Sequence, residues 1–587
     1  MTERTINTDW TLRPHPRLAA RPGPLVLVIM DGVGLGRDDE GNAVRLARTP
    51  TLDDLVARRP WVEIRAHGTA VGMPSDADMG NSEVGHNALG CGRVFDQGAK
   101  LVSGAIDEGR LFAGETWKWL AGHCAKAGRP LHFIGLLSDG NVHSHIEHLF
   151  ALLRRAAQDG VRELYVHPLL DGRDVPETSA LTYIDALEAV LRELEAGDSR
   201  RRCRIASGGG RMKVTMDRYE ADWRIVERGW KAHVRGEGRA FGSAREAIET
   251  YRRERPGTID QDLPEFVIHD GGRPVAAIGD GHGVVFFNFR GDRALEITRA
   301  FEQDAFDKFA RGPRPDVLFA GMMQYDGDTL TPRRFLVTPP AIDRTMGELL
   351  ARGGVGQLAI AETQKFGHVT YFWNGNRTGM FDERHERYVE VTSDRVPFEQ
   401  RPWMKAAEVT DRLLEELASG AWRFLRVNFA NGDMVGHTGV HVAAVMAVET
   451  VDLCLARIRA AVRAAHGTLL VTADHGNADE MFEWDAKQKA FQRDEAGRTR
   501  AKTAHTLNPV VFCIDDEGAE EPADPVAALP FGVSGRTVTV RRGRDWELDP
   551  AVAQPGLSNV ANTCLLLLGH EPLALYDPPL IRPAAPR

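Results

Sequence analysis

Short runs of β-branched and aromatic residues recur along the chain, separated by longer stretches with helical patterning. This alternation is typical of α/β proteins with mostly parallel sheets. The clearest helix should span Pro176–Ala196, with Pro and Glu at its start and Gly197 at its end. The predicted strands are Leu25–Met30, Leu131–Leu136, Leu164–Pro168, Val284–Phe289, Leu358–Ala361, Phe424–Phe429 and Leu469–Thr472. Because 587 residues exceed what one hydrophobic core usually serves, we expect two domains.

Polar side chains gather just beyond the carboxyl ends of these predicted strands. The first is Asp31, directly after Met30. The others are Asp139 and His143, Asp171 to Asp174, Arg290 and Arg293, Lys365, Asp433 and His437, and Asp474 and His475. Ligands of open α/β sheets bind beyond the carboxyl ends of the strands. The one-sided placement therefore indicates a functional site.

Composition and charge narrow the classes of function. No apolar run approaches the roughly 18 residues of a membrane-spanning helix, and the polar stretch Met1–Pro16 does not resemble a secretory signal, so we expect a cytoplasmic protein without a membrane partner. A net charge of −10 disfavours a nucleic-acid partner. The six cysteines lack CxxC spacing, which argues against disulfides and a zinc–cysteine site.

Acidic and imidazole residues form compact signatures in the C-terminal part of the chain. They are Asp433-Met-Val-Gly-His437, Asp474-His475-Gly-Asn and Lys502-Thr-Ala-His505. A single His or Asp after a strand is more often a hydrogen-bonded loop residue or a helix cap than a ligand. Three such signatures in one chain favour a metal site, and mixed Asp and His ligands suit borderline divalent ions.

Ser82 lies in the glycine-flanked segment Asp78-Met-Gly-Asn-Ser82-Glu-Val-Gly-His86. In one interpretation Ser82 or Asn81 only caps a helix. In the other, Ser82 is a nucleophile at a helix N-terminus, where the helix dipole and a cation favour the alkoxide and a phosphate attached to it. The segment by itself favours the cap.

Taken together, these motifs resemble the cofactor-independent phosphoglycerate mutases of the alkaline phosphatase superfamily. The resemblance covers nearly the whole chain. Besides the segments above, it rests on Val28-Ile-Met-Asp31-Gly-Val-Gly, Leu137-Ser-Asp-Gly-Asn-Val-His143-Ser-His, Asp171-Gly-Arg173-Asp174-Val-Pro, Phe287-Asn-Phe-Arg290-Gly-Asp-Arg293 and Ala361-Glu-Thr-Gln-Lys365. It implies an alkaline-phosphatase-like domain, residues 1–96 and 340–587, interrupted by an inserted α/β transferase domain, residues 97–339.

The resemblance also implies the site residues. One divalent metal would be held by Asp433, His437 and His505, and a second by Asp31, Ser82, Asp474 and His475. The substrate residues would be His143, Arg173, Asp174, Arg211, Arg218, Arg290, Arg293 and Lys365. We expect two Mn²⁺ ions, with Mg²⁺ or Co²⁺ as alternatives, no 2,3-bisphosphoglycerate, and a monomer that acts on a phosphoglycerate.

The implied reaction interconverts 3- and 2-phosphoglycerate, in glycolysis and gluconeogenesis, through a phosphoserine on Ser82. Asp174 is the candidate acid and base, although it could be a plain ion-pair partner of Arg173. Lys365 would neutralise charge on the bridging oxygen. Arg290 and Arg293 suit phosphate or carboxylate, although they could be surface ion pairs with Asp292 or Glu296.

Some features depart from the common pattern or leave alternatives. Arg211 and Arg218 are seven residues apart, as in the longer plant and protozoan variant, and Lys213 stands where an aromatic is expected. Residues 515–550 should form an insertion with little core of its own, and the Pro/Ala-rich end 578–587 should be disordered. A phosphatase of the same superfamily, a phosphopentomutase and a non-catalytic binding protein are the rival classes. The substrate set in the insertion and the complete ligand set favour the mutase.

Overall fold

The structure, a computed structural model, describes residues 9–73, 75–96, 98–217, 222–325, 330–338, 342–485, 488–494, 497–518, 531–535, 538 and 540–585. The chain divides into two compact units. Unit 1 comprises Met1–Asp96 and Ala341–Arg587, and unit 2 comprises Gln97–Pro340. Both are built on mostly parallel sheets with helices, so the predicted α/β class is confirmed.

The sheet of unit 1 has seven strands in the order β13-β12-β14-β1-β15-β18-β2. Their bounds are β13 Glu386–Val391, β12 Gln357–Glu362, β14 Phe424–Phe429, β1 Leu25–Met30, β15 Thr468–Thr472, β18 Val510–Asp515 and β2 Trp61–Ile64. The first five are parallel, and β18 and β2 extend the sheet through antiparallel pairs. All six residues of β1 are buried, as expected for a strand covered on both faces.

Parallel pairing explains how unit 1 gathers its polar residues. Met30, Phe429 and Thr472 end neighbouring strands that run in the same direction. Because the carboxyl ends of parallel strands share one edge of a sheet, the residues that follow them come together there.

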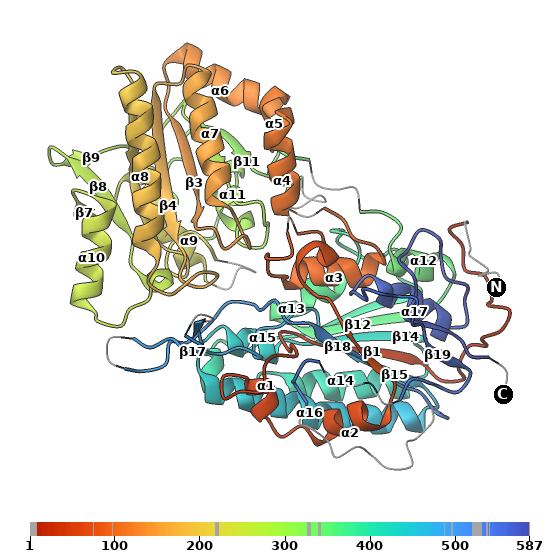
Figure 1. The fold of residues 1–587 in the computed structure, drawn as a ribbon. Coiled ribbons are helices and arrows are strands. Elements are labelled where there is room, and N and C mark those ends of the chain that lie inside the picture. Colours follow the sequence, from red (N-terminus) through yellow and green to blue (C-terminus); the bar gives the residue numbers. More distant parts are fainter. Residues whose placement is uncertain are drawn as a thin grey trace. The chain divides into compact units, whose positions relative to one another are not determined.

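The helices of unit 1 lie on both faces of its sheet. In Figure 1, α3, α12 and α17 lie on one face and α2, α14 and α16 on the other. The bounds are α1 Ala43–Leu46, α2 Pro50–Arg58, α3 Ser82–Cys91, α12 Met346–Arg352, α13 Thr363–Gly367, α14 Ala406–Ala418, α15 Asn431–Gly436, α16 His441–Ala464 and α17 Asn559–Leu567. Two small antiparallel pairs, β16 Trp484–Asp485 with β17 Ala490–Phe491 and β19 Trp546–Leu548 with β20 Ile581–Pro583, complete the unit.

Unit 2 contains a nine-stranded sheet with the main order β11-β10-β3-β4-β6-β8-β7, in which β5 also pairs with β4 and β9 with β8. The bounds are β3 Leu131–Leu137, β4 Glu163–Leu170, β5 Arg202–Ile205, β6 Ser207–Gly210, β7 Arg239–Phe241, β8 Phe266–Asp270, β9 Arg273–Pro274, β10 Gly283–Phe286 and β11 Leu318–Gly321. Strands β11, β10, β3 and β4 are parallel.

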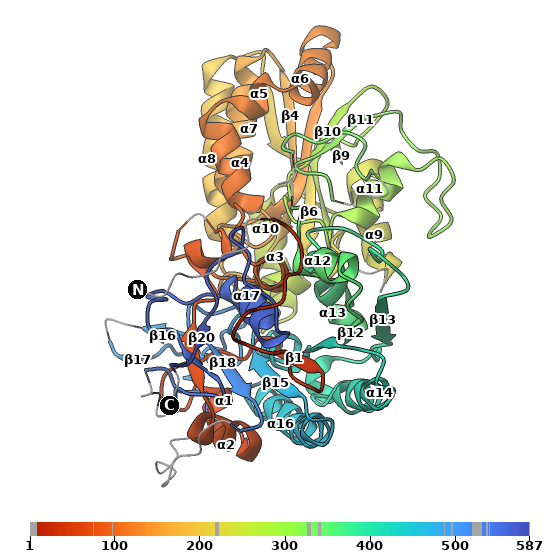
Figure 2. The ribbon, with the colours of Figure 1, turned by 90° about the vertical axis from the view of Figure 1, so that its right-hand side faces the viewer.

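The helices of unit 2 also cover both faces of the sheet. In Figure 2, α7 and α8 lie on one face and α9 and α11 on the other. The bounds are α4 Gly98–Asp107, α5 Arg110–Ala113, α6 Glu115–Ala127, α7 Ile146–Gln158, α8 Ala180–Gly197, α9 Trp223–Trp230, α10 Ala244–Glu254 and α11 Leu295–Glu302. A π-helical turn, Lys231–Arg235, continues α9.

Several expectations about local structure are wrong. Helix α8 begins at Ala180 rather than at Pro176, and β10 ends at Phe286, three residues before the predicted end. Within the described parts of 515–550, Phe531 and Trp546 are fully buried and belong to the main core of unit 1, which agrees with a segment that has little core of its own. The C-terminal end is ordered through residue 585, because β20 pairs with β19 and buries Ile581.

Two further expectations concern membranes and thiols. Among the described residues, no helix combines the length and the apolarity that crossing a membrane requires. All six cysteines are free and buried, which agrees with the absence of a disulfide framework.

Candidate active site

Ser82 is the first residue of helix α3, and Asn81 caps that helix. The Asn81 side chain accepts hydrogen bonds from the backbone N–H groups of Glu83 and Val84. Asn81 is therefore the cap, and the buried Ser82 hydroxyl remains available for other contacts. Its place in the first turn puts it near the positive end of the helix dipole, which favours negative charge on its oxygen.

Three charged or titratable groups surround the Ser82 hydroxyl. Lys365 Nζ lies 2.5 Å from Ser82 Oγ, His475 Nε2 lies 3.0 Å from it, and Asp31 Oδ1 lies 3.3 Å from it. The ammonium of Lys365 donates to Ser82 Oγ and can stabilise negative charge that develops there.

Lys365 also joins the carboxylates on both sides of Ser82. Its Nζ lies 2.9 Å from Asp31 Oδ1 and 2.8 Å from Asp433 Oδ2. Burial favours the neutral amine, but the carboxylates of Asp31, Asp433 and Asp474 outweigh burial and raise the pKa of Lys365. Lys365 therefore carries a fixed positive charge beside the serine.

Asp433, His437 and His505 form a compact group that fits a cation. Nδ1 of His437 lies 2.6 Å from the carbonyl of Thr503, and Nδ1 of His505 lies 2.7 Å from the carbonyl of Gly80. Since a carbonyl only accepts, both Nδ1 atoms carry the proton and both Nε2 atoms present a lone pair. The two Nε2 atoms are 3.0 Å apart, and each lies within 3.2 Å of Asp433 Oδ1.

Asp31, Asp474 and His475 form the neighbouring group. His475 Nε2 lies 3.4 Å from Asp31 Oδ1 and 3.7 Å from Asp474 Oδ2. Burial alone would lower the pKa of His475, but the carboxylates, Asp474 first, raise it to about 9. Two groups of buried ligand atoms within 4.8 Å of one another, Asp433 with His475 and His505, and Asp31 with Asp474 and His475, can hold divalent ions. The residues present thus fit the expected metals.

Backbone geometry allows these residues to approach one another. Gly32, which follows Asp31, has φ +74°, and a Cβ there would lie 2.5 Å from the backbone of Asp433. Only glycine permits both the left-handed conformation and this close approach. The Asp31-Gly segment can therefore pack directly against Asp433.

Three residues outside the predicted ligand set support this group. Asn428 Nδ2 donates to Asp31 Oδ2 at 2.9 Å, and Asn477 Nδ2 donates to Asp433 Oδ1 at 3.1 Å. His86 Nδ1 lies 2.8 Å from the carbonyl of Ser82. Asn477 and His86 lie inside the recognised motifs, and Asn428 lies on β14 just before Asp433. Their positions close to predicted ligands in the sequence could have identified them as supporting residues.

In unit 2, a second buried group forms around Arg211. Its Nη1 lies 2.9 Å from Asp171 Oδ1 and also contacts Asp174 Oδ2. Ser138 Oγ donates to Asp171 Oδ2 at 2.6 Å. Burial and the neighbouring Asp174 raise the pKa of Asp171 although Arg211 opposes them. Arg211 thus makes an ion pair with Asp174.

Two other predicted substrate residues of unit 2, His143 and Arg290, lie beside Asp292. Asp292 Oδ1 lies 3.4 Å from His143 Nδ1 and 3.3 Å from Arg290 Nε. Arg293 Nη1 donates to the carbonyl of Met216 at 2.7 Å. All four side chains of His143, Arg290, Asp292 and Arg293 are buried, so the two arginines are not surface ion pairs.

Two residues of the segment from Arg211 to Arg218 remain to be placed, Arg218 and Lys213. Arg218 lies outside the described residues. The side chain of Lys213 is half exposed, and its Nζ lies 3.7 Å from Asp262 Oδ1. Lys213 therefore makes a surface ion pair.

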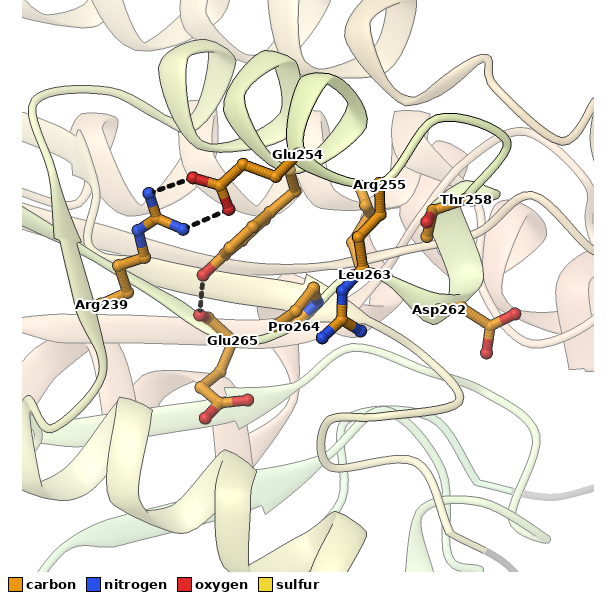
Figure 3. Close-up of a pocket in the computed structure, with 9 residues that line it drawn as sticks. Arg239, Glu254, Arg255, Thr258, Asp262, Leu263, Pro264 and Glu265 are labelled. Carbon is orange, nitrogen blue, oxygen red and sulfur yellow. Dashed lines mark hydrogen bonds and ion pairs between the residues drawn. The ribbon is translucent and has the colours of Figure 1, made fainter.

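A cavity of about 310 Å³ lies elsewhere in unit 2, between α10 and the segment that precedes β8. Figure 3 shows its lining residues, among them the bidentate ion pair of Arg239 with Glu254. None of the candidate site residues that the structure describes lines it.

Comparisons with known proteins give one family. Residues 102–327 match the model of the family described as BPG-independent PGAM N-terminus. The probable 2,3-bisphosphoglycerate-independent phosphoglycerate mutase of Leptospira interrogans is 52% identical over 564 residues, which cover 96% of this chain and 98% of the relative. The 2,3-bisphosphoglycerate-independent phosphoglycerate mutase of Trypanosoma brucei brucei is 48% identical, with 98% and 100% covered.

A solved structure of Leishmania mexicana phosphoglycerate mutase, obtained at low cobalt concentration, superposes with a TM-score of 0.90. It is 47% identical to this chain, and the match covers 98% of this chain and 100% of that one.

Proposed function

Because the chain belongs to the family of 2,3-bisphosphoglycerate-independent phosphoglycerate mutases, we propose that it interconverts 3-phosphoglycerate and 2-phosphoglycerate, in glycolysis and gluconeogenesis, without 2,3-bisphosphoglycerate. The observation that carries the proposal is the buried Ser82 hydroxyl at the start of α3, in contact with Lys365, His475 and Asp31. A serine with these neighbours is suited to accept and return a phosphoryl group.

Two groups of residues would hold the divalent ions. Asp433, His437 and His505 would bind one ion, and Asp31, Ser82, Asp474 and His475 the other, as the family resemblance implies. The contacts of His437 with Asp433 and of Ser82 with His475 support this division. His475 also lies within reach of Asp433 and His505. Mn²⁺ is best matched to the mixed oxygen and nitrogen ligands. When bound, these ions neutralise phosphoryl charge and favour the serine alkoxide. This part, residues 1–96 and 340–587, would act as the phosphatase-like domain.

The phosphoryl group passes to Ser82 and back. Ser82 Oγ attacks the phosphorus of 3-phosphoglycerate, and Lys365, held charged by its carboxylates, stabilises the oxygens as charge moves between them. Glycerate then turns over while it stays bound. Its 2-hydroxyl attacks the phosphoserine, which releases Ser82 and gives 2-phosphoglycerate.

Residues 97–339 would form the transferase domain that holds glycerate. Arginine guanidinium groups bind carboxylate in a fixed fork geometry, which suits Arg290 and Arg293 to the carboxyl group of the substrate. Asp174 would protonate the departing alkoxide and deprotonate the incoming hydroxyl. Its ion pair with Arg211 holds the Asp174 carboxylate in place.

One incubation tests the proposal. Purified protein with 3-phosphoglycerate and Mn²⁺, free of 2,3-bisphosphoglycerate, should form 2-phosphoglycerate. Ser82→Ala, prepared in the same way, should form none. Release of inorganic phosphate without 2-phosphoglycerate would instead identify a hydrolase.

A further inference from the structure

Four histidines and two hydroxyl groups form a continuous hydrogen-bonded chain through the core of unit 2. The links are His282 Nδ1 to His132 Nε2 at 3.0 Å, His132 Nδ1 to His167 Nε2 at 3.0 Å, His167 Nδ1 to Ser207 Oγ at 2.7 Å, Ser207 Oγ to His233 Nδ1 at 2.8 Å, and His233 Nε2 to Thr215 Oγ1 at 2.9 Å. Every member except His282 is completely buried. The mechanism above uses none of them.

The backbone at one end sets the direction of every bond. The N–H of Gly279 donates to His282 Nδ1, so this nitrogen is an acceptor and His132 Nε2 must donate to it. A neutral ring has one N–H, which makes His132 Nδ1 an acceptor for His167. His167 Nε2 therefore donates to His132 Nδ1, and His167 Nδ1 accepts from the Ser207 hydroxyl. The Ser207 oxygen then accepts from His233 Nδ1. This leaves His233 Nε2 as the acceptor of the Thr215 hydroxyl. Burial lowers the pKa of His233 to about 3, which agrees with a neutral ring.

Thr215 needs such support because of its backbone. Its φ of +69° lies in the left-handed region, which β-branched residues rarely adopt. Two contacts hold it besides His233. Its N–H donates to the carbonyl of Ile225 at 2.9 Å, and Gly229 of helix α9 packs so closely that a Cβ there would lie 2.0 Å from Thr215 Oγ1.

The next residue connects Thr215 to a candidate substrate residue. The carbonyl of Met216 accepts a hydrogen bond from Arg293 Nη1 at 2.7 Å. The Met216 carbonyl belongs to the next peptide unit, so its direction depends on the torsion angles of Thr215 and Met216 together. The Met216 N–H donates to the carbonyl of Val214 at 2.7 Å, across Thr215, and this contact ties the placement of Met216 to the conformation of Thr215. The orientation of the Arg293 guanidinium therefore depends on the conformation of Thr215.

We propose that His233 and Thr215 are positioning residues for substrate binding, which hold the Met216 carbonyl so that Arg293 presents its guanidinium to the substrate. The inference rests on the proposed function, since it takes Arg293 as a substrate residue. In this proposal the buried histidines fix the conformation of Thr215 in addition to packing in the core. Neither His233 nor Thr215 needs to touch the substrate.

The test compares steady-state kinetics of variants that differ by one buried hydroxyl. Thr215→Val removes the hydroxyl at nearly constant volume and should raise KM for 3-phosphoglycerate roughly tenfold, with a smaller change in kcat. Thr215→Ser keeps the hydroxyl and should restore KM. The matched control is Thr298→Val, also at a fully buried position. Among the described residues, the Thr298 hydroxyl bonds only the Ala294 carbonyl, which the Thr298 N–H already bonds. This control should leave KM unchanged.

A double variant separates positioning from a general loss of packing. If Thr215 acts through Arg293, Thr215→Val should raise KM no further in an Arg293→Ala background. The same fold-change in both backgrounds, or an unchanged KM in Thr215→Val, would overturn the inference. If Thr215→Val does not fold, Ser207→Ala, which removes the acceptor on the other side of the His233 ring, carries the same comparison.

Failure of the proposed function would look different. It would show in the wild-type protein as phosphate release without 2-phosphoglycerate, and KM for that release could still be compared among the variants. The inference and the proposed function can therefore fail separately.

Discussion

The buried histidines of unit 2 should make that unit sensitive to acid. Burial lowers the pKa of His132 and His167 well below the ordinary value and that of His233 to about 3. In the unfolded chain each ring regains a pKa near 6.5. Below that pH the unfolded chain binds more protons than the folded one, so the stability present at neutral pH is lost as the pH falls through about 6.5.

The magnitude follows from the linkage of protonation and folding. A histidine that stays neutral in the folded state, with an unfolded pKa of about 6.5, contributes about 1.9 kcal/mol less stability at pH 5 than at pH 7. Three such histidines give a loss of about 6 kcal/mol. This is a large part of the roughly 5–15 kcal/mol by which a typical domain is stable.

Hydrogen exchange of the intact chain can measure this loss in unit 2. The amides of β4, which contains His167, should be followed at pH 7, 6 and 5, with correction for intrinsic exchange rates. His132→Gln should reduce the change in opening free energy between pH 7 and pH 5 by about 2 kcal/mol. His269→Gln, which removes a partly exposed ring from β8, should not change it. A change in opening free energy below about 1 kcal/mol in the wild-type protein would refute the reasoning.

Three further predictions concern the proposed reaction. Ser82→Ala should keep its melting temperature yet lose mutase activity, and phosphate trapped on the wild-type protein should map to Ser82; phosphate on a histidine would contradict the mechanism. Arg290→Ala should lower kcat/KM about 30- to 150-fold, which corresponds to about 2–3 kcal/mol. It should also raise the amount of phosphate released per 2-phosphoglycerate formed, because glycerate escapes before it is phosphorylated again. An unchanged ratio of the two products would show that Arg290 does not retain glycerate. Chelation should abolish activity and Mn²⁺ restore it, and full activity of verified metal-free protein would end the metal hypothesis. Metal affinity should already fall as the pH drops below about 9, because His475 must be neutral to bind and its pKa in the metal-free protein is raised to about 9.

Much of the fold was predictable because the local pattern and the tertiary structure agree. The run Leu25–Met30 coincides with β1, since a strand buried on both faces must be apolar throughout. The start of α8 was harder, because Pro176 suits a first helical turn but here lies in a turn in which Ser179 donates to its carbonyl. The tail was misjudged because its Pro/Ala composition does not reveal that Ile581 pairs with Leu548.

The candidate site was predictable as a set of residues but not as a set of contacts. Asp31 and Asp433 are recognisable because each follows a strand, and parallel pairing then brings them together. The contact of Asp174 with Arg211 depends on packing between segments 37 residues apart, which the sequence does not reveal. The histidine chain left no local signal, because His132, His167 and His233 lie on three separate elements.

The central place of β1 constrains the order in which the protein can fold during synthesis. Both of its neighbours, β14 and β15, lie in the second segment of unit 1, and Leu25 pairs with Phe424. At roughly 5–20 residues per second, about 400 residues of intervening chain take on the order of 20–80 s to translate. Through that time β1 has neither partner strand, whereas unit 2 is made as one uninterrupted stretch and has all its strands first. In the nascent chain, the apolar strand β1 must therefore be kept from aggregating until β14 and β15 have been translated.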